Sequence, residues 1–126
     1  MPHIEIFVPG HPEPKPQKYT KGSHPQWRWR ENLGLMVKVH RTPEWPLRVP
    51  VALGMQFYVR VRGERRPPDF KNLWACAEDA LKGILYVDDY LVDRVICPSG
   101  RTVIEFGAHI DGQIEGVALV IEWGEV

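Results

Sequence analysis

Large apolar side chains occupy every second position over residues 51–61, the most regular stretch of the chain. The positions between them include the polar residues Gln56, Tyr58 and Arg60, and Arg62 continues the series. Side chains two residues apart lie on the same face of a strand, so the pattern predicts a long β-strand over 51–62 with one buried face. A shorter alternation predicts another strand over residues 3–8.

Apolar residues recur at helical spacing in two other stretches. The first comprises Trp29, Leu33, Met36, Val37 and His40, and it predicts a helix over about 26–40. The second predicts a helix over about 69–82, with Asp69 as its N-cap and Gly83 as its stop. Its apolar stripe consists of Phe70, Leu73, Trp74, Ala77, Ala80, Leu81 and Ile84.

Three further strands are expected near 90–97, 102–108 and 116–123. The resulting order β-α-β-α-β-β-β indicates an α+β domain, with two helices on a mixed, largely antiparallel sheet. A chain of 126 residues is long enough for one hydrophobic core and not for two, so we expect residues 1–126 to form a single domain.

The composition is that of an ordinary globular protein, with 44% hydrophobic and 25% charged residues. No apolar run approaches the length of a membrane span and no signal peptide is evident, so we expect a cytoplasmic protein that does not contact a membrane. Cys76 and Cys97 are too few and too far apart for a disulfide framework or a zinc site, and both are expected to be buried free thiols.

The formal net charge is zero, but the charges are unevenly distributed along the chain. Residues 14–30 contain five basic residues and no acidic one. Beyond Arg101 there are five acidic residues and no lysine or arginine. A second basic group comprises Arg60, Arg62, Arg65, Arg66 and Lys71. This asymmetry predicts a basic and an acidic face on one neutral domain. Within the first basic stretch Trp27 is a candidate for stacking on an exposed base.

Acidic groups are concentrated in and just beyond the second helix. Asp69 and Asp79 share one helix face with Asn72 and Cys76, because these residues are spaced three or four apart. A short loop then brings Asp88 and Asp89 back toward the helix. Mg²⁺ prefers oxygen ligands and usually takes one or two carboxylates, so Asp69 with Asp88 or Asp89 would suffice to bind it.

A structural interpretation of the same residues stays open. Asp69 caps the helix, Asn72 bonds its first turn, Asp79 pairs with Lys82 or an arginine, and the Asp88-Asp89 pair makes a turn.

The order of these residues resembles the signature of the RusA family of Holliday-junction resolvases. In that family a helix opens with Asp-x-Asp-Asn-Leu-x-Lys and an Asp-Asp pair follows after a short loop. The corresponding stretches here are 68–73, 78–83 and 86–89. The N-terminal stretch 7–15, Phe-Val-Pro-Gly-His-Pro-Glu-Pro-Lys, is similar to the family's opening strand and its Gly-x-Pro-x-Pro-Lys turn.

The resemblance implies a homodimer that binds four-way DNA junctions and cuts them symmetrically with Mg²⁺ held by aspartates. Asp69 matches the first catalytic Asp, and Asp89 matches the Asp of the pair, with Asp88 beside it. Asp69 and Asp89 are therefore the expected metal ligands. The expected DNA contacts are Lys15, Lys18, Arg65, Arg66, Lys71 and Asn72. Several aromatic residues that a small domain leaves exposed would favour the dimer: Trp27, Trp45, Trp74, Tyr86 and Tyr90.

Two positions depart from the family pattern: Lys71 replaces the second Asp, and Ala75 replaces the Lys. The first change shifts the local charge by two units, and each nearby unit charge is worth on the order of a few kcal/mol at an effective dielectric of ~20. Two functions from different classes follow. One is a Mg²⁺-dependent junction endonuclease in recombination and repair. The alternative is a catalytically degenerate protein that binds branched DNA without cutting it. A protein-binding partner that uses an acidic sheet is a third possibility.

Overall fold

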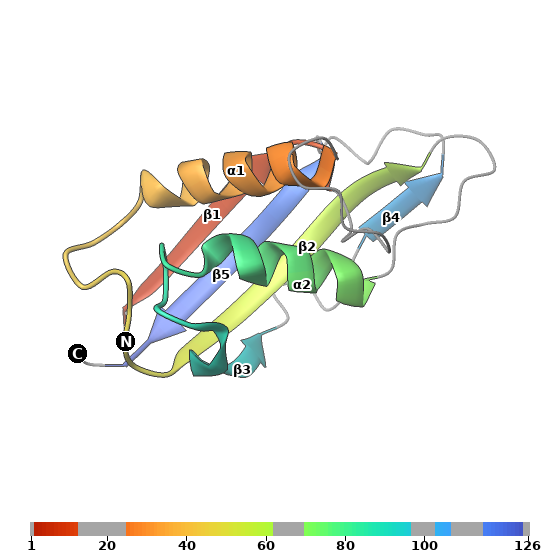
Figure 1. The fold of residues 1–126 in the computed structure, drawn as a ribbon. Coiled ribbons are helices and arrows are strands. Elements are labelled where there is room, and N and C mark those ends of the chain that lie inside the picture. Colours follow the sequence, from red (N-terminus) through yellow and green to blue (C-terminus); the bar gives the residue numbers. More distant parts are fainter. Residues whose placement is uncertain (1, 13–24, 62–69, 97–102, 107–114, 125–126) are drawn as a thin grey trace.

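The computed structural model describes residues 2–12, 25–61, 70–96, 103–106 and 115–124. Five strands in this part of the chain form one mixed sheet, and two α-helices lie on one of its faces (Figure 1). The elements are β1 (His3–Pro9), α1 (Pro25–Lys38), β2 (Val51–Val61), α2 (Phe70–Leu81), the short 3-10 helix η1 (Asp89–Leu91), β3 (Val92–Ile96), β4 (Val103–Phe106) and β5 (Gly116–Trp123). The α+β class and the element order are confirmed. Where the flanking residues are described, the observed boundaries lie within two residues of the predicted ones.

The long strand β2 is the centre of the sheet. One edge of β2 pairs antiparallel with β5 from Val51↔Trp123 to Tyr58↔Gly116, and β5 pairs antiparallel with β1. The other edge is shared by two short parallel strands, β3 beside residues 51–54 and β4 beside residues 58–61. The antiparallel ladders are the longer ones, in agreement with the expected sheet.

The core lies between the sheet and the helices. Val51, Leu53, Phe57 and Val59 of β2 are fully buried on the face that the helices cover, as the alternation predicted. Helix α1 contributes Trp29, Leu33 and Val37, and α2 contributes Leu73, Cys76, Ala77 and Leu81. Cys76 is a buried free thiol, as expected, whereas Cys97 lies outside the described residues. Two members of the predicted α1 stripe are on the solvent side: Met36 is 38% exposed, and His40 follows the end of the helix.

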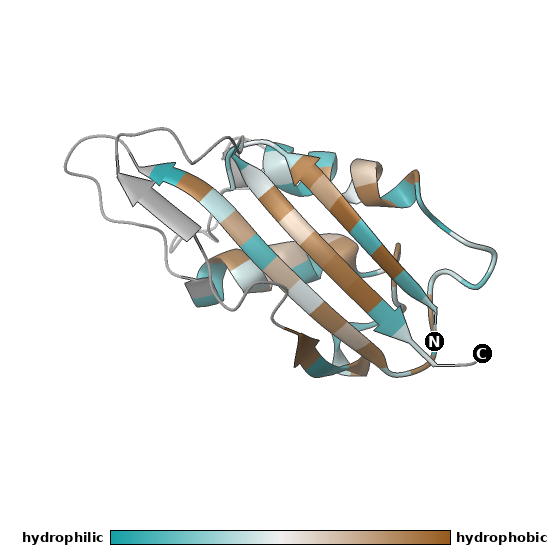
Figure 2. Cartoon of the chain, turned by 180° about the vertical axis from the view of Figure 1, so that it is seen from behind, coloured by the Kyte–Doolittle hydropathy of each residue, from teal (hydrophilic) through white to brown (hydrophobic). Residues whose placement is uncertain are grey.

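The expectation that β2 buries only one face is wrong for its first half. Ala52 and Gln56, which lie on the opposite face, are 1% and 4% exposed. Figure 2 shows this opposite face of the sheet, which neither α1 nor α2 covers. The end of β3 closes over part of it, because the Ile96 carbonyl oxygen lies so near Gly54 that an added Cβ would be 2.6 Å away. Alternation along one strand carries no information about such a neighbour.

Most of the aromatic residues expected to remain exposed are packed. Tyr86 is fully buried, and Trp45 is 8% exposed and packs edge-on against Trp123 with 6.1 Å between the ring centroids. Trp27 and Trp74 are partly buried. Tyr90 is the member of this group that is clearly exposed, at 74%. Neither helix within the described ranges is long and apolar enough to cross a membrane.

Replacing Gly54 by alanine should destabilise the fold by about 1–3 kcal/mol, because the added methyl group meets backbone rather than a movable side chain. Urea unfolding gives the free energy directly. Gly124→Ala is the matched control, since nothing lies within 4 Å of the Cβ position there. Equal stability of the two variants would show that β3 can move away from β2 at no cost.

Candidate metal and DNA-binding site

The loop that follows α2 turns back sharply. Gly83 has a φ of 82°, the left-handed conformation that glycine adopts most easily, and the helix ends just before it, as predicted. The Gly83 amide donates to the Tyr86 carbonyl at 2.7 Å, and the Leu85 amide donates to the Leu81 carbonyl at 2.9 Å. These bonds close a compact turn between α2 and the Asp88-Asp89 pair.

Two sets of contacts hold the returning chain in place. Leu47 accepts a hydrogen bond from the Val87 amide at 3.0 Å and donates its own amide to the Leu85 carbonyl at 2.8 Å. The buried Tyr86 hydroxyl donates to the Glu78 carbonyl of α2 at 2.7 Å. Burial first, and then the negative charges of Glu78, Asp89 and Asp79, raise the pKa of Tyr86, so its hydroxyl remains a donor. The carboxylate pair therefore stands beside α2, as the sequence predicted.

Asp88 has a structural function. Its side chain caps η1 by accepting the Asp89 amide at 2.8 Å, and its Oδ1 lies 3.4 Å from Nζ of Lys82. The hydrogen bonds from the Asp89 side chain and amide, together with Lys82, lower the pKa of Asp88. The turn that the structural interpretation expected at the Asp88-Asp89 pair is thus present. The contact with Lys82, which that interpretation gave to Asp79, is made by Asp88.

Asp89 lies in a different electrostatic environment. Its shared hydrogen bond with Asp88, followed by burial and the negative charges of Asp88 and Asp79, raises the pKa of Asp89. Lys82 opposes this rise without cancelling it. A bound cation is favourable at a carboxylate that other negative charges surround, so Asp89 is the better candidate metal ligand of the pair.

Glu78 belongs to the same group of acids and was given no function from the sequence. Its Oε2 accepts a hydrogen bond from Nε1 of Trp74 at 2.8 Å. Burial, aided by the charges of Asp89 and Asp79 and opposed by the Trp74 bond, raises the pKa of Glu78. The available signal was its spacing, because Glu78 follows Lys71 by two helical turns and so lies on the same side of α2.

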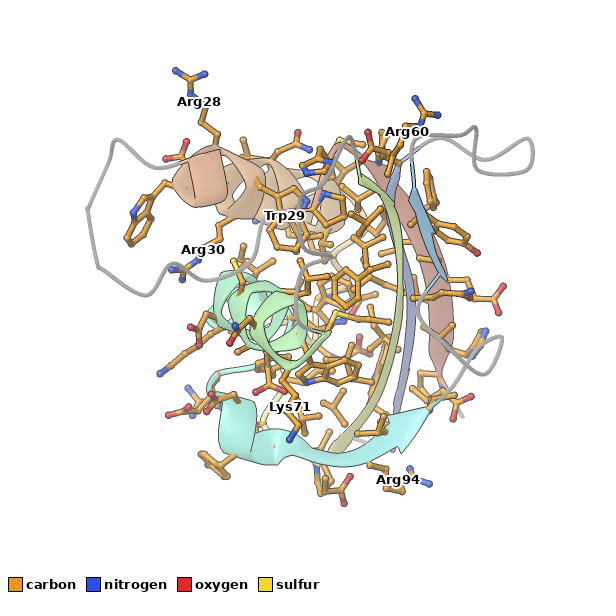
Figure 3. The ribbon with its side chains drawn as sticks, turned by 90° about the vertical axis from the view of Figure 1, so that its right-hand side faces the viewer. Arg28, Trp29, Arg30, Arg60, Lys71 and Arg94 are labelled. Carbon is orange, nitrogen blue, oxygen red and sulfur yellow. The ribbon has the colours of Figure 1, made fainter. Side chains whose placement is uncertain are left out.

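The acids that surround Asp89 lie in the second half of α2. Glu78 is eight residues from Phe70, which corresponds to about 12 Å along the helix axis. Lys71 and Asn72, both exposed, occupy the first turn, and the Lys71 side chain extends toward the side of η1 and β3 (Figure 3). Asp69 lies outside the described residues, so its pairing with Asp89 stays a prediction. Among the residues described, no three or more His, Cys, Asp or Glu side chains are arranged to hold a metal ion.

The predicted DNA contacts fall mostly on parts of the chain without a described structure. Lys15, Lys18, Arg65 and Arg66 are all outside the described ranges. Of the neighbouring basic residues, Arg60 is partly buried at the end of β2 (Figure 3). The guanidinium of Arg30 lies 4.9 Å from the centroid of the Trp27 ring, a cation–π distance, and so occupies one face of the indole expected to stack on a base.

An open groove of about 530 Å³ lies where α1 and α2 meet. Its lining includes the cations Arg30 and Lys38 together with the anions Glu31 and Asp79. This mixture gives no net attraction for a phosphate backbone, so the groove does not extend the predicted DNA path.

A family match spans the acidic loop. The sequence model of the family described as Endodeoxyribonuclease RusA matches residues 9–110 of the chain. No curated protein matches the chain. The matched stretch includes the turn at Gly10, helix α2 and the Asp88-Asp89 pair. By this match over most of its length, the chain belongs to the RusA endodeoxyribonuclease family.

Proposed function

We propose that this protein is a Mg²⁺-dependent endonuclease that resolves four-way DNA junctions during recombination and repair. One observation carries the proposal: in a chain of the RusA family, the structure returns the Asp88-Asp89 pair to the side of α2 and holds it there by bonds to Leu47 and Glu78. RusA is described as an endodeoxyribonuclease, which supports phosphodiester cleavage as the reaction.

The residues present suit Mg²⁺. The candidate ligands Asp69 and Asp89 offer only carboxylate oxygens, which this hard cation prefers, and one or two carboxylates are its usual protein complement. Asp88 is occupied by the η1 cap and by Lys82, which leaves Asp89 as the proposed ligand of the pair. Bound Mg²⁺ would supply an activated water and charge stabilisation at the scissile phosphate.

The other proposed site residues act on the DNA backbone. Lys15, Lys18, Arg65 and Arg66 would contact phosphates and set the orientation of the junction. Lys71 and Asn72 stand exposed on the first turn of α2, where a donor can reach a phosphate oxygen. Contacts of this kind carry no base information, so we expect recognition of the junction's shape rather than of its sequence.

A second function, binding of branched DNA without cleavage, is favoured by the first turn of α2. Lys71 places an ammonium where the family has a carboxylate, and Ala75 removes the cation that would face the phosphate. An ammonium close to Asp69 or to the Asp88-Asp89 pair competes with the metal for the same oxygens. Cleavage by the natural sequence should accordingly be slow.

The double substitution Lys71→Asp with Ala75→Lys should raise junction cleavage at least about tenfold, because it restores a carboxylate ligand and moves the cation one turn along the helix. The measurement is single-turnover cleavage of a labelled four-way junction in Mg²⁺, with junction binding followed in Ca²⁺. Asp69→Asn should abolish cleavage, whereas Asp93→Asn on the exposed part of β3 should not change it.

Brisk cleavage by the unmodified protein that is lost on Asp69→Asn would contradict the competition by Lys71 and leave two aspartates as a sufficient site. Undiminished binding with no cleavage by any of these variants would identify the protein as a binder of branched DNA.

Replacing Arg65 and Arg66 together by alanine should flatten the salt dependence of junction binding. Each phosphate contact contributes about −0.9 to the slope of log K against log salt, so the loss of two contacts should reduce the slope by about 2. Fluorescence anisotropy over a salt series provides the slopes. The exposed pair Arg41 and Arg48 is the matched control, and an equal effect of both pairs would mean that Arg65 and Arg66 are ordinary surface residues.

A homodimer is proposed because two symmetric cuts require two sites related by a two-fold axis. Exposed apolar side chains that a partner could cover include Leu35 at 65% and Val39 at 80%, both near the end of α1. Sedimentation equilibrium at micromolar concentration should give twice the chain mass of 14.5 kDa. A mass of one chain throughout the concentration range would contradict the dimer.

A further inference from the structure

One carboxylate joins three chain segments at the end of the sheet away from the chain termini. Glu115 immediately precedes β5, and its side chain is 21% exposed. Its Oε2 accepts the backbone amide of Arg60 at 3.0 Å and also contacts Nδ1 of His11. Its backbone carbonyl accepts the Gly10 amide at 3.0 Å. Glu115 therefore ties the residues that follow β1 and the end of β2 to the start of β5.

The chain leaving β1 has little freedom at this point. Gly10 has a φ of 129°, a conformation open to glycine and strained for other residues. Asn32 of α1 donates to the preceding Pro9 carbonyl at 3.3 Å. Burial by itself would raise the pKa of Glu115, but the bonds from His11 and the Arg60 amide and the nearby positive charges outweigh it and lower the pKa. The carboxylate thus keeps its charge and its acceptor capacity.

The two strand ends that Glu115 joins lead into the segments with the proposed DNA contacts. Residues 13–24, which include Lys15 and Lys18, follow His11 along the sequence. Residues 62–69, which include Arg65 and Arg66, follow the end of β2 just beyond Arg60. Glu115 lies beyond the stretch 9–110 matched by the family, so the family match assigns it no function.

We propose that Glu115 is a positioning residue for DNA, which sets the starts of the two basic segments relative to each other through His11 and the Arg60 amide. The proposal rests on the proposed junction-binding function. A cation whose attachment point is fixed loses less conformational freedom when it meets a phosphate, so removal of the Glu115 carboxylate should weaken binding without removing any DNA contact.

The chain provides a matched control in Glu122. It lies on β5, the strand that Glu115 precedes, and it too contacts a histidine. Its Oε1 is 3.3 Å from Nδ1 of His3 in β1, at the opposite end of the β1–β5 ladder. Glu115→Ala should raise the dissociation constant for a four-way junction in Ca²⁺ about tenfold, because several side chains lose their preorganisation. Glu122→Ala should change the dissociation constant by no more than about twofold from that of the unmodified protein. Both variants should lower the melting temperature by similar amounts.

Two further variants separate positioning from a loss of stability. Glu115→Gln retains an oxygen that accepts the Arg60 amide and should recover most of the affinity. In a chain that already carries Arg65→Ala and Arg66→Ala, the effect of Glu115→Ala should shrink to about twofold, because Glu115 acts partly through those arginines. If Glu115→Ala does not fold, a comparison of His11→Ala with His3→Ala tests the same contact. His11→Ala should bind the junction about threefold more weakly than His3→Ala.

Two results would overturn the positioning role while the junction function stands. One is equal dissociation constants for Glu115→Ala and Glu122→Ala. The other is an undiminished effect of Glu115→Ala on binding in the chain that carries Arg65→Ala and Arg66→Ala. Failure of the unmodified protein to prefer a four-way junction over a linear duplex would overturn the junction function itself, and the positioning role with it.

Discussion

The structure depends on the backbone ladder of β2. The other strands in the described part of the sheet pair with β2 directly or, in the case of β1, through β5. The buried side chains along β2 form the floor on which α1 and α2 pack, with Trp29 of α1 against Phe57 at a centroid distance of 6.4 Å. β2 is paired along both edges, and its first half is buried on both faces, so this strand can move little. Gly54 therefore stays close against the backbone of Ile96.

The acidic loop obtains its position from this framework indirectly. Tyr86 is the connecting residue, because its ring is fully buried while its hydroxyl reaches the Glu78 carbonyl of α2. A phenol can fill a core position and still satisfy a hydrogen-bonding group at the edge of the core, which makes it suited to anchoring a loop. The Asp88-Asp89 pair follows within three residues and so inherits a defined place beside the helix.

The electrostatics of that place distinguish two carboxylates that are adjacent in sequence. Asp88 is stabilised in its charged form by an amide and by Lys82, whereas Asp89 is surrounded by further acids. Glu78 adds to the negative field from the third turn of α2. Lys71, two turns earlier on the same side, carries the opposite charge. Among the described residues, this distribution makes a cation more favourable near Asp89 than near Lys71.

The sequence by itself determined the secondary structure and the fold class. Alternation in β2 and the apolar stripe of α2 are local properties, set by the two-residue and 3.6-residue periods of strand and helix, and Gly83 marks the end of α2 through its own backbone preference. The short loop likewise made the return of Asp88 and Asp89 to α2 predictable. The placement of Asp69 and of the basic residues around it stays a prediction.

Only the tertiary structure decided which faces are covered and which environment each carboxylate has. Burial of Gln56 and Tyr86 depends on neighbours distant in sequence, and no periodicity reports them. The different environments of Asp88 and Asp89 depend on Lys82 and on the η1 cap. Glu78 joins the same group of acids because the loop after α2 returns to the helix. Glu115 is the clearest case, since its partners lie 55 and 104 residues away along the chain. Periodicity is a property of neighbouring residues, whereas burial and charge are properties of everything within a few ångströms, and only folding brings those groups together.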